Sequence, residues 1–241
     1  MKSRPPISSD PTDVPWTNVS TFVRQLAHDI RNDLNALELE IALLSEQKDG
    51  ASAPDHAFSG LRESVRNSVT RLRLVSARVD AITIRPTRIP ITDLVEVTRE
   101  RIRKLHPSDS PPQWDLPAQG GSLEADISLL AEALAEIVSN AIDFREDENP
   151  IKIIGRPEGH LVRLDVVEKK QRRPVGMASW GSSPLQQIRR SHYGLGLYFA
   201  ARVVVAHGGT IDRAYDATCS LFRTSILLPL AIGGTHGMST A

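Results

Sequence analysis

The residues best suited to chemistry are His28 and Asp29, which are adjacent in a stretch that contains neither Pro nor Gly. A neutral imidazole nitrogen is a nucleophile near neutral pH, and a neighbouring carboxylate can orient the ring or take its proton. Asn32 follows His28 by about one helical turn. This spacing allows nucleophilic chemistry at His28, although a histidine that is merely solvated is the simpler interpretation of these residues alone.

The stretch 21–44 is predicted to be an amphipathic helix that presents His28 to solvent. Its apolar residues recur at steps of three and four, which places them in one stripe along the helix. The members of this apolar stripe are Phe22, Leu26, Ile30, Leu34, Leu37, Ile41 and Leu44. At about 100° per residue, His28 projects away from the stripe, together with Arg31 and Asn32.

Residues 28–35 read His-Asp-Ile-Arg-Asn-Asp-Leu-Asn, which resembles the H-box of sensor histidine kinases. The box has a proline where this chain has Asp33. The resemblance implies that His28 is phosphorylated, that Asp29 is the general base, and that Asn32 orients water during dephosphorylation. In this hypothesis Arg31 neutralises phosphate charge.

Length and composition favour a globular protein with one large domain or two modest ones. The chain has 241 residues, of which 40% are hydrophobic and 24% charged, and its net charge of zero argues against a nucleic-acid binder. Cys219 is the only cysteine, so an internal disulfide is excluded and a reducing, cytoplasmic location is expected. No apolar run approaches the roughly 20 residues that cross a bilayer, and the first residues lack the apolar core of a signal peptide.

Four segments are expected along the chain. Residues 1–17 are predicted to be a disordered lead-in with no room for a sensor domain, and residues 231–241 a disordered tail. Residues 18–85 are predicted to form an antiparallel hairpin of two amphipathic helices, 18–47 and one that ends before Pro86. One hairpin cannot bury both apolar stripes, so a homodimer with a four-helix bundle is expected. Packing of the hairpin on its own chain is the alternative.

Residues 86–230 are expected to combine helices with antiparallel strands, which gives the whole chain an α+β class. The predicted helices are 93–105, capped by Asp93, then 123–144 and 196–207. The predicted strands are 88–91, 114–116, 150–155, 161–167, 210–215 and 220–228. Residues 168–190 are predicted to be a loop.

Two polar residues of the predicted helix 123–144 resemble the N-box of the ATP-binding fold that histidine kinases share with type II topoisomerases. Asn140 matches the asparagine that holds the phosphate-bound Mg²⁺, and Glu136 matches a second polar position one turn earlier. An amide and a carboxylate at this spacing can reach one hydrated Mg²⁺. A polar pair on an ordinary amphipathic helix is the alternative.

The sequence around Gly194 and Gly196 resembles the second glycine box of the same fold, which reads GLGL, then a helix, then His-Gly-Gly. Glycines before a helix let backbone N–H groups approach phosphates at the positive end of the helix. The order of H-box, helix pair, N-box and glycine box extends over about residues 20–230. It implies a dimerisation hairpin (18–85) followed by an α/β-sandwich of the histidine-kinase ATP-binding type (86–230).

The first glycine box departs from the family pattern. The box reads Asp-x-Gly-x-Gly and its Asp binds the adenine amino group, but Glu168, Lys170 and Arg172 stand at those positions here. A glutamate could accept the same hydrogen bond from a displaced position, whereas the loss of both glycines removes conformational freedom that the turn needs. The nucleotide pocket thus resembles the family at the N-box and the second glycine box but not at the first glycine box. This favours a protein that has the kinase scaffold without kinase activity.

The favoured hypothesis is a two-component phosphorelay protein whose His28 exchanges a phosphoryl group with an Asp of a response-regulator receiver domain. The second hypothesis is an autophosphorylating histidine kinase that binds Mg-ATP, with Mg²⁺ on Asn140. Its nucleotide-binding residues would be Glu136, Asn140, Glu168, Gly194 and Gly196. The third is a non-catalytic dimeric adaptor that docks receivers without carrying phosphate.

Overall fold

The structure is a computed structural model that describes residues 14–46, 54–117, 121–175, 177, 181, 183–185, 188 and 193–231. The chain forms two compact units. The first combines Met1–Asp80 with Ser182–Leu195, and the second combines Ala81–Gly181 with Gly196–Ala241. Of the predicted disordered ends, 1–17 and 231–241, residues 1–13 and 232–241 lie outside the described residues, as do most residues of the predicted loop 168–190 from residue 176 onward. Trp16 and Thr17, which are expected in the disordered lead-in, are helical.

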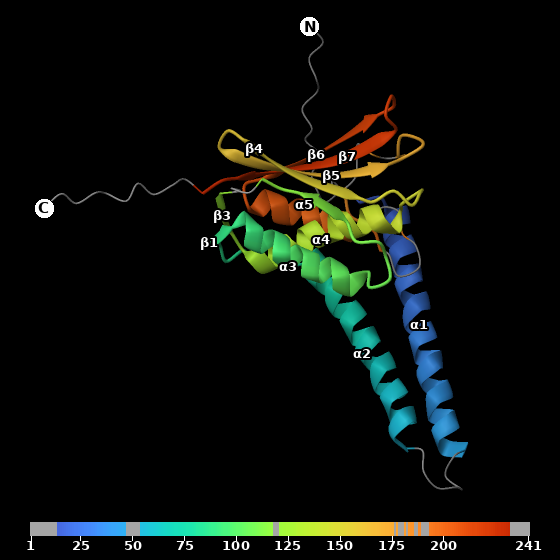
Figure 1. The fold of residues 1–241 in the computed structure, drawn as a ribbon. Helices are drawn as coiled ribbons and strands as arrows, with labels where there is room; N and C mark the ends of the chain where they lie inside the picture. Colours follow the sequence, from blue (N-terminus) through green and yellow to red (C-terminus); the bar gives the residue numbers. More distant parts are fainter. Residues whose placement is uncertain are drawn as a thin grey trace, which may run out of the picture. The chain divides into compact units, whose positions relative to one another are not determined.

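A hairpin of two long helices forms most of the first unit. Helix α1 spans Trp16–Glu46 and α2 spans Pro54–Val79, as the apolar periodicity predicts. Figure 1 shows the two helices side by side and running in opposite directions. The Ser68 hydroxyl of α2 donates a 2.8 Å hydrogen bond to Oδ2 of Asp33 on α1, so these two positions are level with each other.

The apolar stripe of α1 is only partly covered by α2. Its half-buried members are Phe22, Leu26, Ile30 and Leu37. Leu34 is 53% exposed and Ile41 54% exposed, and on α2 the side chains of Leu72 and Val79 are 44% and 55% exposed. Apolar side chains left in water at helical spacing indicate a surface that packs against a further partner.

The second unit is built on a five-stranded sheet in the order β2-β4-β5-β7-β6. Its strands are β2 (Gln113–Asp115), β4 (Lys152–Glu158), β5 (Leu161–Lys169), β6 (Thr210–Asp216) and β7 (Leu221–Pro229). Strand β2 pairs with β4 in parallel, and the other neighbours pair antiparallel. A separate antiparallel pair joins β1 (Thr87–Pro90) to β3 (Ser122–Ala125).

Three helices of this unit, α3, α4 and α5, lie against one face of the sheet (Figure 1). Their bounds are Ile91–Leu105 for α3, Ile127–Asp143 for α4 and Gly196–Ala206 for α5. Their apolar sides meet the sheet in one core, whose members Leu94, Leu130, Leu164, Val203 and Ile226 are at most 1% exposed. This layering of helices on a largely antiparallel sheet confirms the α+β class. Within the described part of the chain, none of the helices combines the length and apolarity that a membrane span needs.

Two predicted helix starts are wrong. Asp93 lies inside the first turn of α3, whose N-cap position is Pro90, and no side chain caps that helix. Leu123 lies in strand β3, opposite Ile89, and α4 begins only at Ile127, after an N-cap at Asp126. Burial alternates residue by residue over Ser122–Ala125, which is the period of a strand. Four residues are too few for that period to be distinguished in the sequence from the helix that follows.

Strand β5 continues past the predicted end at Val167. Glu168 and Lys169 pair with Phe222 and Leu221 of β7, so the predicted loop begins later than residue 168. Successive side chains of a strand alternate between its faces, and residues two apart share a face. Glu168 and Lys170 are both buried, which agrees with this extended geometry.

The His-Gly-Gly sequence after α5 is explained by packing within the second unit. Buried His207 donates from Nδ1 to the carbonyl of Val203 at 2.7 Å, and its Nε2 accepts from the backbone N–H of Asp126 at 3.0 Å. A Cβ on Gly209 would lie 2.5 Å from the carbonyl oxygen of Leu227, so only glycine fits there. These residues join the end of α5 to the start of α4 and to β7.

Candidate functional site

His28 lies in α1 with its side chain 57% exposed. Its Nδ1 is 3.2 Å from the side-chain nitrogen of Asn32, one turn later on the same face. Because the amide nitrogen and oxygen exchange places when the group is rotated, Asn32 can donate to Nδ1 or accept from it. Nδ1 is engaged in either case, and the hydrogen bond selects the tautomer of the ring. When the side-chain oxygen of Asn32 accepts the proton of Nδ1, the lone pair of the neutral ring is on Nε2, which is then the ring nitrogen available to an incoming reactant.

Asp29 is buried, with 3% exposure, and among the described residues Gln25 and Tyr193 donate hydrogen bonds to it. Nε2 of Gln25 donates to Oδ1 at 2.8 Å, and the hydroxyl of Tyr193 donates to Oδ2 at 2.8 Å. Oδ1 also lies 3.6 Å from Nδ1 of His28, slightly beyond the length of a hydrogen bond. The carboxylate is thus held in one orientation beside the imidazole.

The surroundings of His28 extend from α1 onto α2. Arg31 is exposed on α1, and Asp33, which replaces the proline of the H-box, is bonded to Ser68. His28 lies five residues before Asp33 on α1, and Arg73 lies five residues after Ser68 on α2. Because both helices rise about 1.5 Å per residue and run antiparallel, Arg73 is level with His28.

The second group of candidate residues lies in the second unit, apart from Gly194. Glu136 and Asn140 are half-buried and one turn apart on α4. Gly196 is the first residue of α5, whereas Gly194 belongs to the first unit and has a left-handed φ of +67°. The two glycines of the predicted box therefore fall on opposite sides of the division between the units. The described residues contain no cluster of three or more His, Cys, Asp or Glu that could hold a metal ion.

The side chain of Lys170 pairs with Glu168 inside the second unit. Its ammonium lies 2.9 Å from Oε2 of Glu168, and the residues are 4% and 6% exposed. The same ammonium donates to the carbonyl of Phe144, directly after α4. The backbone of Lys170 is also held, since its N–H donates to Ser220 at 2.9 Å and its carbonyl accepts from the Tyr215 hydroxyl at 3.1 Å.

Burial raises the pKa of Glu168 to about 7, and the hydrogen bond and charge of Lys170 act in the opposite direction. The nearby carboxylate of Glu146 adds to the rise. The backbone N–H of Phe144 donates to the carbonyl of Asn140 at 3.2 Å, so contacts run without a break from Glu168 through Lys170 to the end of α4. The carboxylate expected to meet a nucleotide is thus part of an internal network.

Residues 125–231 match the family described as histidine kinase-, DNA gyrase B- and HSP90-like ATPase. The structure of the Acinetobacter baumannii histidine kinase AdeS resembles this one with a TM-score of 0.57 at 17% identity, over 85% of this chain and 98% of that one. The fold is that of a histidine-kinase core. A comparison with curated proteins found no match.

Two further histidine kinases share this core. Full-length ShkA, in complex with AMPPNP, has a TM-score of 0.59 at 18% identity, over 92% of this chain and 47% of that one. ThkA, in complex with the response regulator protein TrrA, has a TM-score of 0.54 at 16% identity, over 90% of this chain and 63% of that one. These likenesses and the matched ATPase domain agree on the same fold. At such identities they establish the fold, and the chemistry has to be argued from this chain's own residues.

Sequence reasoning missed three residues that complete these arrangements. Gln25 lies four residues before Asp29, which is the spacing of helical neighbours, so helix geometry alone could have indicated it. Lys170 lies two residues after Glu168, the spacing of one strand face, but the loop prediction for this segment concealed that signal. Tyr193 is 164 positions from Asp29, and no local pattern indicates their contact.

Proposed function

We propose that this chain is a phosphotransfer protein of a two-component system that carries a phosphoryl group on His28. The proposal is carried by the contrast between the two candidate sites. The exposed imidazole of His28 lies beside Asp29 and Asn32, which can accept its proton. The carboxylate of Glu168 is already paired with Lys170. The first arrangement favours a phosphohistidine, and the second disfavours recognition of an adenine.

The transfer step follows from the exposure of His28. The lone pair of Nε2 attacks the phosphorus of an aspartyl phosphate on a receiver domain, forming a P–N bond as the P–O bond breaks and the aspartate leaves as a carboxylate. The proton on Nδ1 is held by the side-chain oxygen of Asn32, or by Oδ1 of Asp29 at 3.6 Å. Arg31 supplies positive charge to the phosphoryl oxygens. The reverse steps return the phosphoryl group to a receiver.

Mg-ATP does not fit the arrangement at the end of β5. An adenine amino group needs an accepting carboxylate, but Oε2 of Glu168 lies 2.9 Å from the ammonium of Lys170 in a buried pair. Lys170 and Arg172 also stand where the family has glycines, which are used where backbone must approach a ligand closely. The contact between Lys170 and Phe144 further ties this segment to the end of α4.

An ATP-dependent histidine kinase is the second candidate function. Glu136 and Asn140 keep the residue types and the one-turn spacing that can reach a hydrated Mg²⁺. The AMPPNP complex of the similar ShkA supports this candidate as well. It requires the Glu168–Lys170 pair to open when nucleotide binds, at the cost of leaving a buried charge unpaired.

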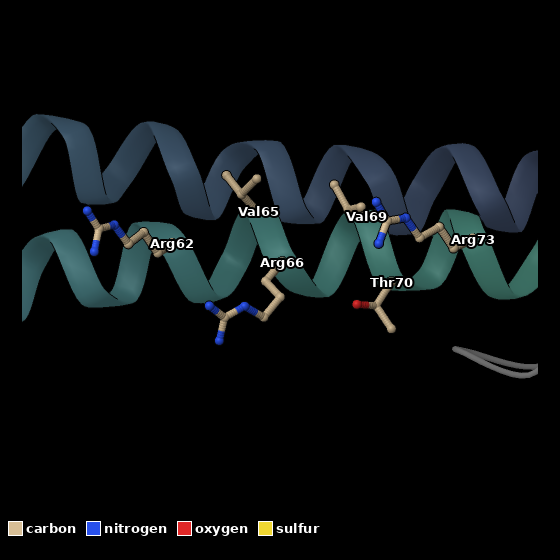
Figure 2. A pocket seen from close by; sticks show the side chains of 6 residues that line it. All are labelled: Arg62, Val65, Arg66, Val69, Thr70 and Arg73. Atoms are coloured by element: carbon tan, nitrogen blue, oxygen red, sulfur yellow. The ribbon is translucent and has the colours of Figure 1, made fainter.

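A receiver domain is proposed to dock along α2, beside His28. Arg62, Val65, Arg66, Val69, Thr70 and Arg73, here named the α2 row, line a surface hollow of about 340 Å³ (Figure 2). Their spacing places them on one side of the helix, and Arg73 is level with His28. Guanidinium groups beside valines suit a protein surface that carries carboxylates and a phosphoryl group. The complex of the similar ThkA with a response regulator supports a receiver as the partner.

A second copy of the chain is proposed to cover the exposed apolar residues outside the α2 row. Leu34 and Ile41 on α1, with Leu72 and Val79 on α2, are 44–55% exposed. Pairing two hairpins into a four-helix bundle would bury them. Analytical ultracentrifugation is expected to show a dimer, and Leu34→Glu is expected to give a folded monomer. A monomeric wild-type chain at micromolar concentration would contradict this proposal.

Two labelling experiments test the proposed function. In the first, the wild-type chain and His28→Ala are incubated with Mg²⁺ and ATP labelled on its γ-phosphate, and neither is expected to acquire acid-labile label. In the second, purified receiver domains that carry labelled phosphate on their aspartate are offered to both proteins. Label is expected to move to the wild-type chain and not to His28→Ala, with circular dichroism showing that both are folded.

Each contrary result identifies a different function. Label from ATP on the wild type alone would establish a kinase, and transfer of label to His28→Ala would refute the role of His28. Receiver binding that is equal for both proteins, without any transfer, would favour a non-catalytic adaptor.

A further inference from the structure

The segment Ser182–Leu195, which contains the start of the second glycine box, belongs to the first unit. Tyr193 in this segment is 8% exposed, and its ring meets Phe22 of α1 edge to face, with centroids 5.6 Å apart and planes at 87°. Gly194 follows with a φ of +67°, and its carbonyl accepts from the N–H of Leu185 at 3.1 Å. The turn at Gly194 therefore follows an aromatic side chain that is packed on the helix of His28.

The hydroxyl of Tyr193 and the side-chain amide of Gln25 each hold one carboxylate oxygen of Asp29 by a hydrogen bond. The hydroxyl donates to Oδ2 at 2.8 Å, while Gln25 donates to Oδ1 at 2.8 Å from one turn earlier on α1. Oδ1 also lies 3.6 Å from Nδ1 of His28. With a donor on each oxygen, rotation of the carboxylate away from the imidazole breaks at least one hydrogen bond in a buried environment.

We infer that Tyr193 is a positioning residue for phosphotransfer at His28, and that the start of the glycine-box segment serves the phosphoacceptor site. This inference rests on the proposed function. Tyr193 acts through Asp29: by holding Oδ2, it keeps Oδ1 directed at the imidazole, where it receives the Nδ1 proton as the P–N bond forms. Misplacement of a proton acceptor by about 1 Å can slow a reaction severely, so the hydrogen bond that orients the Asp29 carboxylate affects the transfer rate directly.

The test compares wild type with Tyr193→Phe, which removes the hydroxyl and keeps the ring against Phe22. The rate of phosphoryl transfer from a labelled receiver domain is expected to fall about tenfold. Because a hydrogen-bond donor favours the ionised form of a carboxylate, its removal is also expected to move the acidic limb of the pH–rate profile to higher pH. A purely structural role would reduce the amount of active protein and leave that limb in place.

Two further variants make the comparison specific. Tyr215→Phe also loses one hydroxyl hydrogen bond, which runs to the carbonyl of Lys170 at 3.1 Å in the second unit, and it is expected to transfer at the wild-type rate. Gln25→Leu removes the donor to Oδ1 and is expected to move the pH profile in the same direction as Tyr193→Phe.

The outcomes separate this inference from the proposed function. If wild type exchanges phosphate, His28→Ala does not, and Tyr193→Phe keeps the wild-type rate and profile, the inference is overturned and the proposed function stands. If wild type itself accepts no phosphoryl group from any receiver, both are overturned. A slower Tyr193→Phe with a displaced acidic limb supports the positioning role.

Discussion

The ammonium of Lys170 lies 2.9 Å from the carboxylate of Glu168, and both side chains are buried at the end of β5. A buried ion pair adds little net stability, because desolvation offsets the attraction, but removal of one partner leaves an uncompensated charge. The carbonyl of Phe144 gives the ammonium a second acceptor. The pair therefore belongs to the packing of the second unit, and its energetics can be measured without any ligand.

The first prediction concerns the pH dependence of stability in Glu168→Gln. The folded state raises the pKa of Glu168 from 4.5 to about 7, so it binds a proton that the unfolded chain has released. This contribution to stability is complete below pH 4.5 and is lost as the pH rises to about 7. The free energy of unfolding, measured in urea from pH 4.5 to 8, should therefore fall more steeply with pH in wild type than in Glu168→Gln. Parallel curves would contradict the assigned pKa.

The second prediction concerns Lys170→Met, which leaves Glu168 buried without its cation. At pH 8 the free energy of unfolding should fall by about 3 kcal/mol, because an ionised carboxylate then lacks a partner. The loss should be smaller at pH 5, where Glu168 is protonated in the folded state. The double variant Glu168→Leu/Lys170→Met is the control and should recover most of the stability. Additive losses in the double variant would show that the two side chains are not coupled.

The sequence predicts those parts of the fold whose pattern is long and local. The helix that carries His28 lies where its apolar spacing predicts, and so does the helix that carries Asn140 from Ile127 onward, because each helix shows its buried face in its own residues. The short strand at Leu123 is assigned wrongly, since its pairing with Ile89 comes from a segment more than thirty residues away. The end of β5 is likewise decided by β7, which pairs with Glu168 and Lys169.

The same division holds for the candidate sites. His28, Asp29 and Asn32 share one helix, so their separations follow from helical spacing. The contact of Tyr193 with Asp29 depends on how the chain returns to α1 and has no local signature. The pairing of Glu168 with Lys170 could be predicted only in part. Two residues that are two positions apart share a face of a strand, so the contact follows once the segment is known to be extended, but the prediction of a loop gives no reason to expect it.

The third prediction concerns Asn32, whose amide nitrogen lies 3.2 Å from Nδ1 of His28. We propose that this exposed amide positions water during hydrolysis of a receiver's aspartyl phosphate. Asn32→Ala should slow that hydrolysis about tenfold, while transfer through His28 falls less because Asp29 still receives the ring proton. Release of inorganic phosphate from a labelled receiver measures the first rate, and a short time course of labelling measures the second.

Asn35→Ala is the matched control for this variant. Asn35 is exposed on the same helix and on the side of His28, and Asn35→Ala should leave the ratio of the hydrolysis rate to the transfer rate unchanged. Equal slowing of hydrolysis and transfer in Asn32→Ala would instead assign Asn32 to orienting the imidazole, with no separate role toward water.

The fourth prediction concerns the α2 row and its guanidinium groups. Arg66→Glu and Arg73→Glu reverse charge on the face that is level with Asn35 and His28, so both should weaken receiver binding about tenfold. The loss should be largest at low salt, because exposed charges are screened within about 10 Å at 0.1 M ionic strength. Titration calorimetry at two salt concentrations measures both effects.

Arg88→Glu tests whether net charge alone explains such a loss. Arg88 is exposed on β1 in the second unit, so its reversal changes the total charge equally and should leave the affinity unchanged. If all three variants bind the receiver alike, the α2 row is not the docking face. The exposed side chain of Leu39, which lies three helical turns from His28 on the same side of α1, then becomes the next position to substitute, because a docking receiver must still reach Nε2 of His28.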